Sequence, residues 1–213
     1  MRAPTGEIRE RQRPYVELLT GQAPVLDLGC GRGELLGLLR EAGIEARGVD
    51  ADADMVAFAA GEGLEVEQAD ALAALTGAPD GSLGAVTALQ LVEHLPPAPL
   101  VRLLELAAAK LRPDGLLILE TINPVSPRAL QHYFSDLTHS QPLVAATLAL
   151  LVRNAGFAEV EVRYLNPPEE RLLQVELPAG EEWDGARAAL EENRRLVQQA
   201  LFAPLDYAIV ARR

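Results

Sequence analysis

The sequence predicts an α/β protein built around a mostly parallel sheet. Short apolar segments alternate along the chain with segments of helical periodicity, which is the pattern produced by successive strand–helix–strand units. The segment Leu116–Leu119 is continuously apolar, as expected for a parallel strand that helices cover on both faces. The chain has 213 residues, of which 49% are hydrophobic, and this is enough for one domain with a single core.

Turn and capping residues between these segments place the elements in order. The predicted strands are 25–28, 46–50, 64–68, 84–89, 116–121, 157–165 and 205–210, and the main predicted helices are 34–42, 53–60, 98–111, 143–154 and 183–202. Right-handed crossovers bring the carboxyl ends of parallel strands to one edge of the sheet, and ligands bind along that edge.

Composition argues against several classes of function. The formal net charge of −12 disfavours nucleic acid as a partner, because polyanion binding depends on Lys and Arg side chains that neutralise phosphates. No apolar stretch is long enough to predict a membrane span, and the first residues lack a secretory signal pattern, so we expect a cytoplasmic protein. The single cysteine, Cys30, is consistent with that location and cannot form an internal disulfide.

A glycine-rich turn follows the first predicted strand. Gly29, Gly31 and Gly33 alternate between this strand and the next helix, whose free N–H groups point into the same space. A dinucleotide-binding loop needs another glycine where this chain has Glu34, whose carboxylate would repel a pyrophosphate. Together with the acidic Asp27, this favours a ligand that carries an amine or a sulfonium. An ordinary tight turn is the alternative.

Acidic residues also follow the second and third predicted strands. Asp50 lies about twenty residues after the glycine turn, where a carboxylate commonly accepts hydrogen bonds from both hydroxyls of a ribose. Asp70 follows the third strand and precedes a short helix that begins at Ala71. Asp70 is therefore a candidate for capping that helix, for ligand binding, or for both.

These motifs resemble those of the class I S-adenosylmethionine (SAM)-dependent methyltransferases, in which an acidic residue precedes Gly-x-Gly-x-Gly between the first strand and the first helix. The resemblance implies SAM as the cofactor and a Rossmann-like sheet with an antiparallel last strand in a single domain, 1–213. It implies that the turn holds the methionine part of SAM, that an aspartate after the third strand reaches the adenine, and that the residues after the fourth strand lie beside the methyl group. The implied cofactor-binding residues are Asp27, Gly29, Cys30, Gly31, Gly33, Asp50, Ala51, Asp70, Ala71, Gln90 and Leu91.

The N-terminal segment, residues 1–20, is predicted to form a helical cap. It carries several arginines on an otherwise acidic chain. In the family that the chain resembles, an N-terminal helix folds over the SAM site, so Arg13 and Tyr15 are candidates for closing the pocket. The alternative is a solvated helix face.

Residues 123–142 form an insertion after the fifth strand, on the side where an acceptor would bind. A connection of this length in a small domain is usually functional, so we expect a lid that selects the acceptor. His94 lies after the fourth strand, and His132 and His139 lie within the insertion. A neutral imidazole can remove the proton of a hydroxyl acceptor, and His139, followed by His94, is the predicted catalytic base. A hydrogen-bonded loop histidine is the alternative for each.

No metal is predicted. A metal site formed by Glu93, His132, Asp136 and His139 is an alternative, but these residues lack the close ligand spacing of known metal motifs.

Segments along the whole chain are similar to methyltransferase domains associated with bacterial lipopolysaccharide and O-antigen synthesis. They are 11–15 (Arg-Gln-Arg-Pro-Tyr), 138–142 (Thr-His-x-x-Pro) and 201–208 (Leu-Phe-x-Pro-x-Asp-Tyr-Ala). This similarity implies methyl transfer to an oxygen of a small polar acceptor such as a saccharide or a sugar phosphate, although Leu137 stands where a proline is usual.

Two other classes of function are alternatives to an O-methyltransferase. One is a non-catalytic protein that binds SAM or S-adenosylhomocysteine and uses an added helix, 181–202, to contact a partner or a second copy in a homodimer. The other is a nucleotide-dependent oxidoreductase, against which Glu34 argues.

Overall fold

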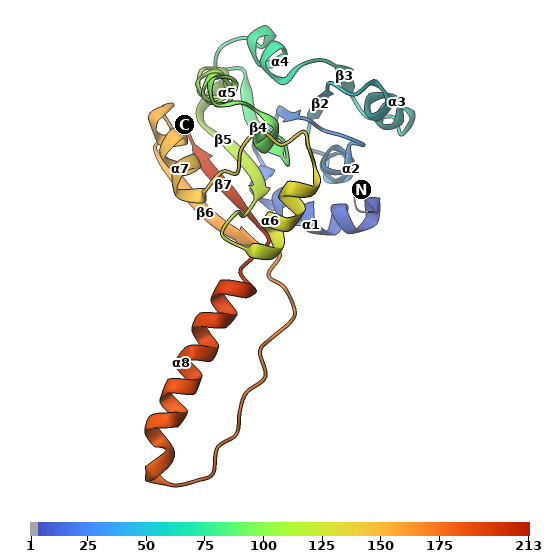
Figure 1. Ribbon diagram of the computed structural model, residues 1–213. Coiled ribbons are helices and arrows are strands. Elements are labelled where there is room, and N and C mark those ends of the chain that lie inside the picture. Colours follow the sequence, from blue (N-terminus) through green and yellow to red (C-terminus); the bar gives the residue numbers. More distant parts are fainter. Residues whose placement is uncertain (1–3) are drawn as a thin grey trace.

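The protein, for which a computed structural model describes residues 4–213, contains a seven-stranded sheet flanked by helices (Figure 1). The strands are β1 (Val25–Leu28), β2 (Ala46–Asp50), β3 (Val66–Gln68), β4 (Leu83–Leu89), β5 (Leu111–Ile122), β6 (Glu159–Leu165) and β7 (Asp206–Arg212). Their order in the sheet is β3-β2-β1-β4-β5-β7-β6. β7 pairs antiparallel with β5 and β6, and the other neighbouring pairs are parallel. The predicted α/β fold and the antiparallel last strand are confirmed.

Helices connect the strands on both faces of the sheet. They are α1 (Thr5–Leu19), α2 (Glu34–Glu41), α3 (Ala53–Gly61), α4 (Ala71–Gly77), α5 (Pro97–Lys110), α6 (Pro127–Ser135), α7 (Ala145–Asn154) and α8 (Asp184–Leu201), with short 3-10 helices η1 (Val92–His94) and η2 (Glu181–Trp183). The first three residues of the predicted N-terminal cap lie outside the described residues, and α1 forms most of the remainder. Within residues 4–213, no helix is long and apolar enough to cross a membrane.

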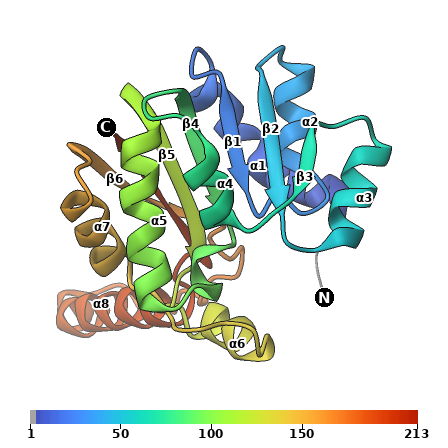
Figure 2. The same ribbon diagram turned by 90° about the horizontal axis from the view of Figure 1, so that it is seen from above.

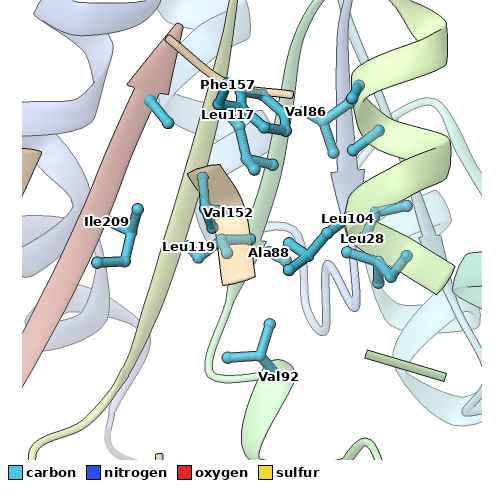
Figure 3. Packing of buried hydrophobic residues seen from close by; sticks show 14 of the residues in the cluster. Leu28, Val86, Ala88, Val92, Leu104, Leu117, Leu119, Val152, Phe157 and Ile209 are labelled. Atoms are coloured by element: carbon cyan, nitrogen blue, oxygen red, sulfur yellow. The ribbon is translucent and has the colours of Figure 1, made fainter. Parts of the chain in front are cut away.

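Alternation along the central strands sorts their side chains onto two faces. Val86 and Ala88 of β4, with Leu117 and Leu119 of β5, belong to the larger core cluster beneath α5 and α7 (Figure 3). The intervening Ile118 belongs to a second cluster, which includes residues of α1 and α2. Figure 2 shows α5 in front of the sheet and α1 behind it. Burial on both faces explains why these strands are apolar without interruption.

The start of β5 and the insertion that follows β5 differ from the predictions. β5 begins at Leu111, five residues earlier than the apolar run suggests, and its register with β4 shifts between Leu83 and Ala85. The 123–142 insertion is not a loop throughout, because it contains α6. The Ser126 hydroxyl accepts a hydrogen bond from the N–H of Ala129 at 3.4 Å, and a proline occupies the first turn. The Ser-Pro pair is thus a helix start, which was not predicted.

An arm projects from the body between β6 and β7 (Figure 1). It consists of an extended segment, residues 166–180, which leads to η2, and of α8, which returns to β7. The predicted long helix between the sixth and seventh strands is therefore present, and it lies beside the extended segment instead of packing on the sheet.

Candidate active site

The glycine turn lies where the order of strands reverses between β1 and β4, which is the usual ligand site of such sheets. Gly29, Gly31 and Gly33 all have positive φ, between 56° and 77°. A Cβ at Gly33 would lie 2.4 Å from Cδ1 of Leu64, and one at Gly29 would lie 3.1 Å from Cδ1 of Leu91. The backbone of the turn is therefore left-handed, and it is closely packed at Gly29 and Gly33. Both properties require glycine at these two positions.

Asp50 ties the end of β2 to this turn. One carboxylate oxygen accepts the N–H of Gly31 at 2.7 Å, and the other accepts the N–H of Asp52 at 2.9 Å. The predicted neighbours Asp50 and Gly31 are therefore brought together across 19 residues of sequence. The carboxylate keeps further lone pairs for other hydroxyl donors.

The buried carboxylates beside the turn have hydrogen-bond partners. Asp27 is buried at the end of β1, where it accepts the hydroxyl hydrogen of Thr87 at 2.6 Å. Glu34, at the start of α2, is buried and bound to the Arg32 guanidinium, with 2.8 Å between Nε and Oε1. The Cys30 side chain packs against β2, because a Cβ at Gly48 would lie 2.7 Å from its sulfur. Cys30 therefore serves as a small apolar contact between the turn and β2.

The residues after β2 and β3 lie at the same sheet edge. Asp70 caps α4, since its carboxylate accepts the N–H groups of Leu72 and Ala73 at 2.9 and 3.2 Å. The capping interpretation is confirmed, and Ala71 is the first residue of that helix. The carbonyl of Ala51 accepts the side-chain amide of Gln68 at 3.2 Å. Contact of Asp70, Ala71 and Ala51 with a cofactor remains a prediction.

Gln90 joins a polar network that sequence reasoning missed. Its backbone has a positive φ of 55°, a strained conformation of the kind that clusters at functional sites. Its side-chain amide lies 3.2 Å from carboxylate oxygens of both Glu120 and Asp206. The Tyr15 hydroxyl donates to Glu120, and the Asn166 amide donates to Asp206 at 2.7 Å. Burial raises the pKa of the Glu120 carboxyl.

The two residues of α1 proposed to close the pocket point in different directions. Tyr15 is buried in the network just described, and burial followed by the charge of Glu120 raises the pKa of its hydroxyl. Arg13 pairs with Glu10 at 2.7 Å, and both side chains are largely exposed. The surroundings of Arg13 match the solvated-face alternative.

Glu93, His94 and His139 meet beyond the end of β4. One potential ligand atom from each of these side chains lies within 4.8 Å of the others, and the centroids of the two imidazole rings are 4.7 Å apart. The insertion is anchored here, because the N–H of Ser140 donates to the Glu93 carbonyl at 2.8 Å. The site thus combines η1 with the insertion after β5.

This grouping differs from the set considered for a metal. His94 takes part in it, whereas His132 is exposed on α6 and Asp136 instead binds Thr138. The sequence signal was present in the adjacent pair Glu93 and His94, but their approach to His139 depends on how the insertion folds back.

Hydrogen bonds fix the tautomer of each neutral imidazole. His139 Nδ1 lies 2.7 Å from the carbonyl oxygen of Tyr133, which can only accept, so Nδ1 carries the hydrogen. The Thr138 hydroxyl donates to Asp136 at 2.6 Å, so at 2.9 Å from His94 Nδ1 it accepts the imidazole hydrogen. Both neutral rings therefore carry a free lone pair on Nε2.

Burial shifts the titration of this cluster. It raises the pKa of Glu93 to about 7, partly opposed by hydrogen bonds to the carboxylate, including one from the Thr121 hydroxyl at 2.8 Å. It lowers the pKa of His94, and the neighbouring charge of His139 lowers it further. His94 is therefore neutral at physiological pH and able to accept a proton.

The hydroxyl of Tyr133 is a second feature that sequence reasoning missed. It is buried and has no hydrogen-bond partner within residues 4–213. Burial raises its pKa, and so does the charge of Glu93, which places it near the cluster. A buried hydroxyl without a partner costs free energy, so it is suited to receive a polar atom of a ligand.

The two halves of the site fit different parts of a methyl-transfer reaction. The carboxylates at the ends of β1 and β2, on either side of the glycine turn, suit a cofactor that bears both an amine and vicinal hydroxyls. The histidine cluster lies farther along the same sheet edge and suits an acceptor with a removable proton.

Comparisons with known proteins agree with this arrangement. Residues 6–162 match the family described as "Methyltransferase domain". The crystal structure of a SAM dependent methyltransferase from Archaeoglobus fulgidus has a TM-score of 0.93 and 34% sequence identity, and the match covers 99% of this chain and 95% of that chain.

Curated relatives carry a more specific name. A ubiquinone biosynthesis O-methyltransferase from Cupriavidus pinatubonensis is 27% identical, over 75% of this chain and 71% of the relative. One from Xanthomonas axonopodis is 34% identical, over 63% of this chain and 62% of the relative. Matches to enzymes of this name from Xanthomonas oryzae cover 44% of their length. The narrower resemblance to lipopolysaccharide and O-antigen enzymes therefore remains a prediction.

The oxidoreductase alternative finds no support in these matches, and the glycine turn keeps the methyltransferase spacing. The chain belongs to the methyltransferase domain family and is a SAM-dependent methyltransferase.

Proposed function

We propose that the protein methylates a neutral hydroxyl group, with a phenol as the favoured class of acceptor, at the cluster of Glu93, His94 and His139. The observation that carries this proposal is the convergence of two imidazoles whose Nε2 lone pairs are free. Bound SAM supplies a methyl group that its sulfonium already activates. The protein then has to align the acceptor, exclude water and take up a proton.

A general base matters for this acceptor. A hydroxyl acceptor must lose its proton as the new bond to carbon forms, whereas an ionised phosphate or carboxylate needs no base. A phenol, with a pKa near 10, gives up its proton to imidazole more readily than the less acidic alcohol of a saccharide does. The paired histidines are therefore best matched to a phenol.

Charge disfavours the predicted sugar phosphate. Burial raises the pKa of Glu93, and the charges of Asp206 and Glu120 raise it further, so three acidic groups lie close together here. Arg128 of α6 already pairs with Glu170 at 2.8 Å. These carboxyl groups would repel a second anion unless they were protonated. A neutral saccharide is compatible with the site and remains the second candidate.

Aromatic surface supports a flat acceptor. The Tyr133 ring stacks on His139, with centroids 4.5 Å apart and an angle of 27° between the planes. Phe134 meets the edge of Tyr133 at 5.5 Å and is largely exposed. The relatives named for ubiquinone biosynthesis are O-methyltransferases, in agreement with methyl transfer to oxygen.

Two measurements test this proposal. Calorimetry should show binding of SAM and S-adenosylhomocysteine and no binding of NAD. Transfer of labelled methyl should then be compared for catechol, methyl glucoside and glucose 1-phosphate, with catechol expected to react fastest. A preference for glucose 1-phosphate would contradict the acceptor class, and failure to bind SAM would contradict the cofactor assignment.

Asp50→Ala is expected to weaken SAM binding by about 1–3 kcal/mol, because it removes charge-assisted hydrogen bonds to the ribose and releases the glycine turn. The matched control is Asp52→Ala. Asp52 caps α3 by accepting the N–H groups of Asp54 and Met55, so its loss should lower helix stability and leave SAM affinity unchanged. Equal affinities of all three proteins by calorimetry would remove Asp50 from the site.

A further inference from the structure

The helix of the projecting arm has an apolar seam that the fold leaves uncovered. Leu190, Val197 and Leu201 are spaced at i, i+7 and i+11 and so lie along one face of α8. Each is 41–46% exposed, and α8, all of which the structure describes, has no buried residue. Most of the stability of a helix in a protein comes from packing of such an apolar face. The seam therefore needs a cover.

The extended segment beside α8 contributes further exposed apolar side chains and leaves the seam uncovered. The Gln198 side chain holds the two together, accepting the N–H of Leu172 at 2.7 Å and donating to the Glu170 carbonyl at 3.1 Å. Leu173 and Val175 of the extended segment are 90% and 60% exposed. Between the segment and α8 runs a groove of about 670 Å³, which Leu190 and Val197 also line. Figure 1 shows this arm standing clear of the sheet.

The charge pattern of α8 identifies what fits this surface. The acidic pair Glu191 and Glu192 is followed, after Asn193, by the basic pair Arg194 and Arg195. A second α8 laid antiparallel about the point between Asn193 and Arg194 brings Glu191 of each helix close to Arg194 of the other, beside the apolar seam. The same alignment sets Leu190 of one helix opposite Val197 of the other. A parallel alignment would instead set like charges together, which is unfavourable.

The charged side chains of α8 could be shared with a second helix at little cost. Within one chain they form Arg194–Glu191 and Arg195–Glu192 bridges, at 2.6 and 2.7 Å. These are exposed pairs three residues apart and contribute little to stability, so sharing them with a second helix costs little. Isologous contacts of this kind are the commonest way in which identical chains associate.

We infer that the arm is a dimerisation element, in which α8 of a second copy of this chain packs antiparallel on the seam and the adjoining groove. The contact surface consists of Leu190, Val197 and Leu201 of α8 together with Leu173 and Val175 of the extended segment. This inference is independent of the methyl acceptor, because no residue of the histidine cluster takes part.

Sedimentation equilibrium of the full chain tests the dimer. The chain mass is 22.9 kDa, and the expected particle has twice that mass. Exchanging two of the three seam residues, Leu190→Glu with Val197→Glu, should weaken association about a hundredfold, because it buries unpaired charges at the contact. Leu196→Glu is the matched control, since Leu196 is 48% exposed but does not line the groove. It should remain dimeric.

Two outcomes would overturn the dimer: a monomeric wild-type chain, or a particle mass that the double variant leaves unchanged. Binding of SAM by the double variant would show that its body is folded. Loss of both the dimer and SAM binding in the double variant would point to general misfolding of that variant. The cross-linking of the cysteine variants would then decide whether the helices associate.

Cross-linking tests the antiparallel orientation without depending on the charged variants. Single Leu190→Cys and Val197→Cys proteins should each stay uncross-linked on mild oxidation, and a mixture of the two should form a disulfide-linked pair. The existing Cys30 is buried and serves as the wild-type background. Cross-linking of either variant with itself, or none in the mixture, would overturn the antiparallel contact.

Discussion

Exchanging both His94 and His139 for glutamine is expected to lower kcat for a phenolic acceptor about 10²–10⁴-fold, the usual contribution of a positioned base. SAM affinity should stay at the wild-type value, because His94 lies in η1 and His139 in the insertion, whereas the predicted SAM-binding residues lie at the glycine turn and the ends of β1 and β2. Glutamine keeps an amide that can donate in place of Nδ1–H but offers no basic nitrogen, so the effect reports proton removal. Initial rates with labelled SAM and catechol, alongside calorimetry with SAM, provide the measurement.

The pH profile separates a base from a structural role. Burial lowers the pKa of His94, and the charge of His139 lowers it further, so His139→Gln should raise that pKa and move the acid limb of kcat/KM to higher pH. His132→Gln is the control, since His132 is exposed on α6 and outside the cluster. Full activity of the double variant, with an unchanged profile, would remove both histidines from catalysis.

The same cluster raises the question of a metal. Two imidazoles and a carboxylate are a donor set that divalent transition metals accept. Activity that persists after treatment with EDTA supports the base mechanism. Activity that EDTA abolishes and Zn²⁺ or Mg²⁺ restores would instead assign Glu93, His94 and His139 to a metal.

Local sequence was sufficient to predict the glycine turn and the carboxylates beside it. The glycine turn needs residues that accept a positive φ. The three glycines at 29, 31 and 33 predict such a turn within a five-residue segment. Asp50 could be placed beside the turn, because parallel neighbouring strands end at one edge. The capping role of Asp70 is also a local property of the residues that follow it.

The rest of the candidate site depends on contacts that no local pattern encodes. Tyr15 meets Glu120 across 105 residues, and Gln90 meets Asp206 across 116. The approach of His139 to His94 requires the fold of α6 and the turn at 136–139. Arg13 shows the opposite case, since Glu10 three residues earlier was a local sign of an exposed pair.

Polar groups buried for function have a cost in stability, and Glu93 is the case in which that cost can be measured. Its folded pKa of about 7 lies above the ordinary 4.5, so the folded state binds the proton more tightly than the unfolded state. The stability that this proton contributes is fully present below pH 4.5 and is lost as pH rises through 7. Glutamine resembles the protonated acid and keeps an oxygen to accept from Thr121.

Glu93→Gln should therefore have a free energy of unfolding near that of the wild type at pH 5 and exceed it at pH 8 by on the order of 3 kcal/mol. Urea unfolding followed by circular dichroism across this range gives the comparison. Glu105→Gln is the control, because Glu105 is an exposed partner of Arg102 on α5 and should show no such divergence. Parallel curves for the wild type and Glu93→Gln would mean that Glu93 is ionised in the fold at little cost.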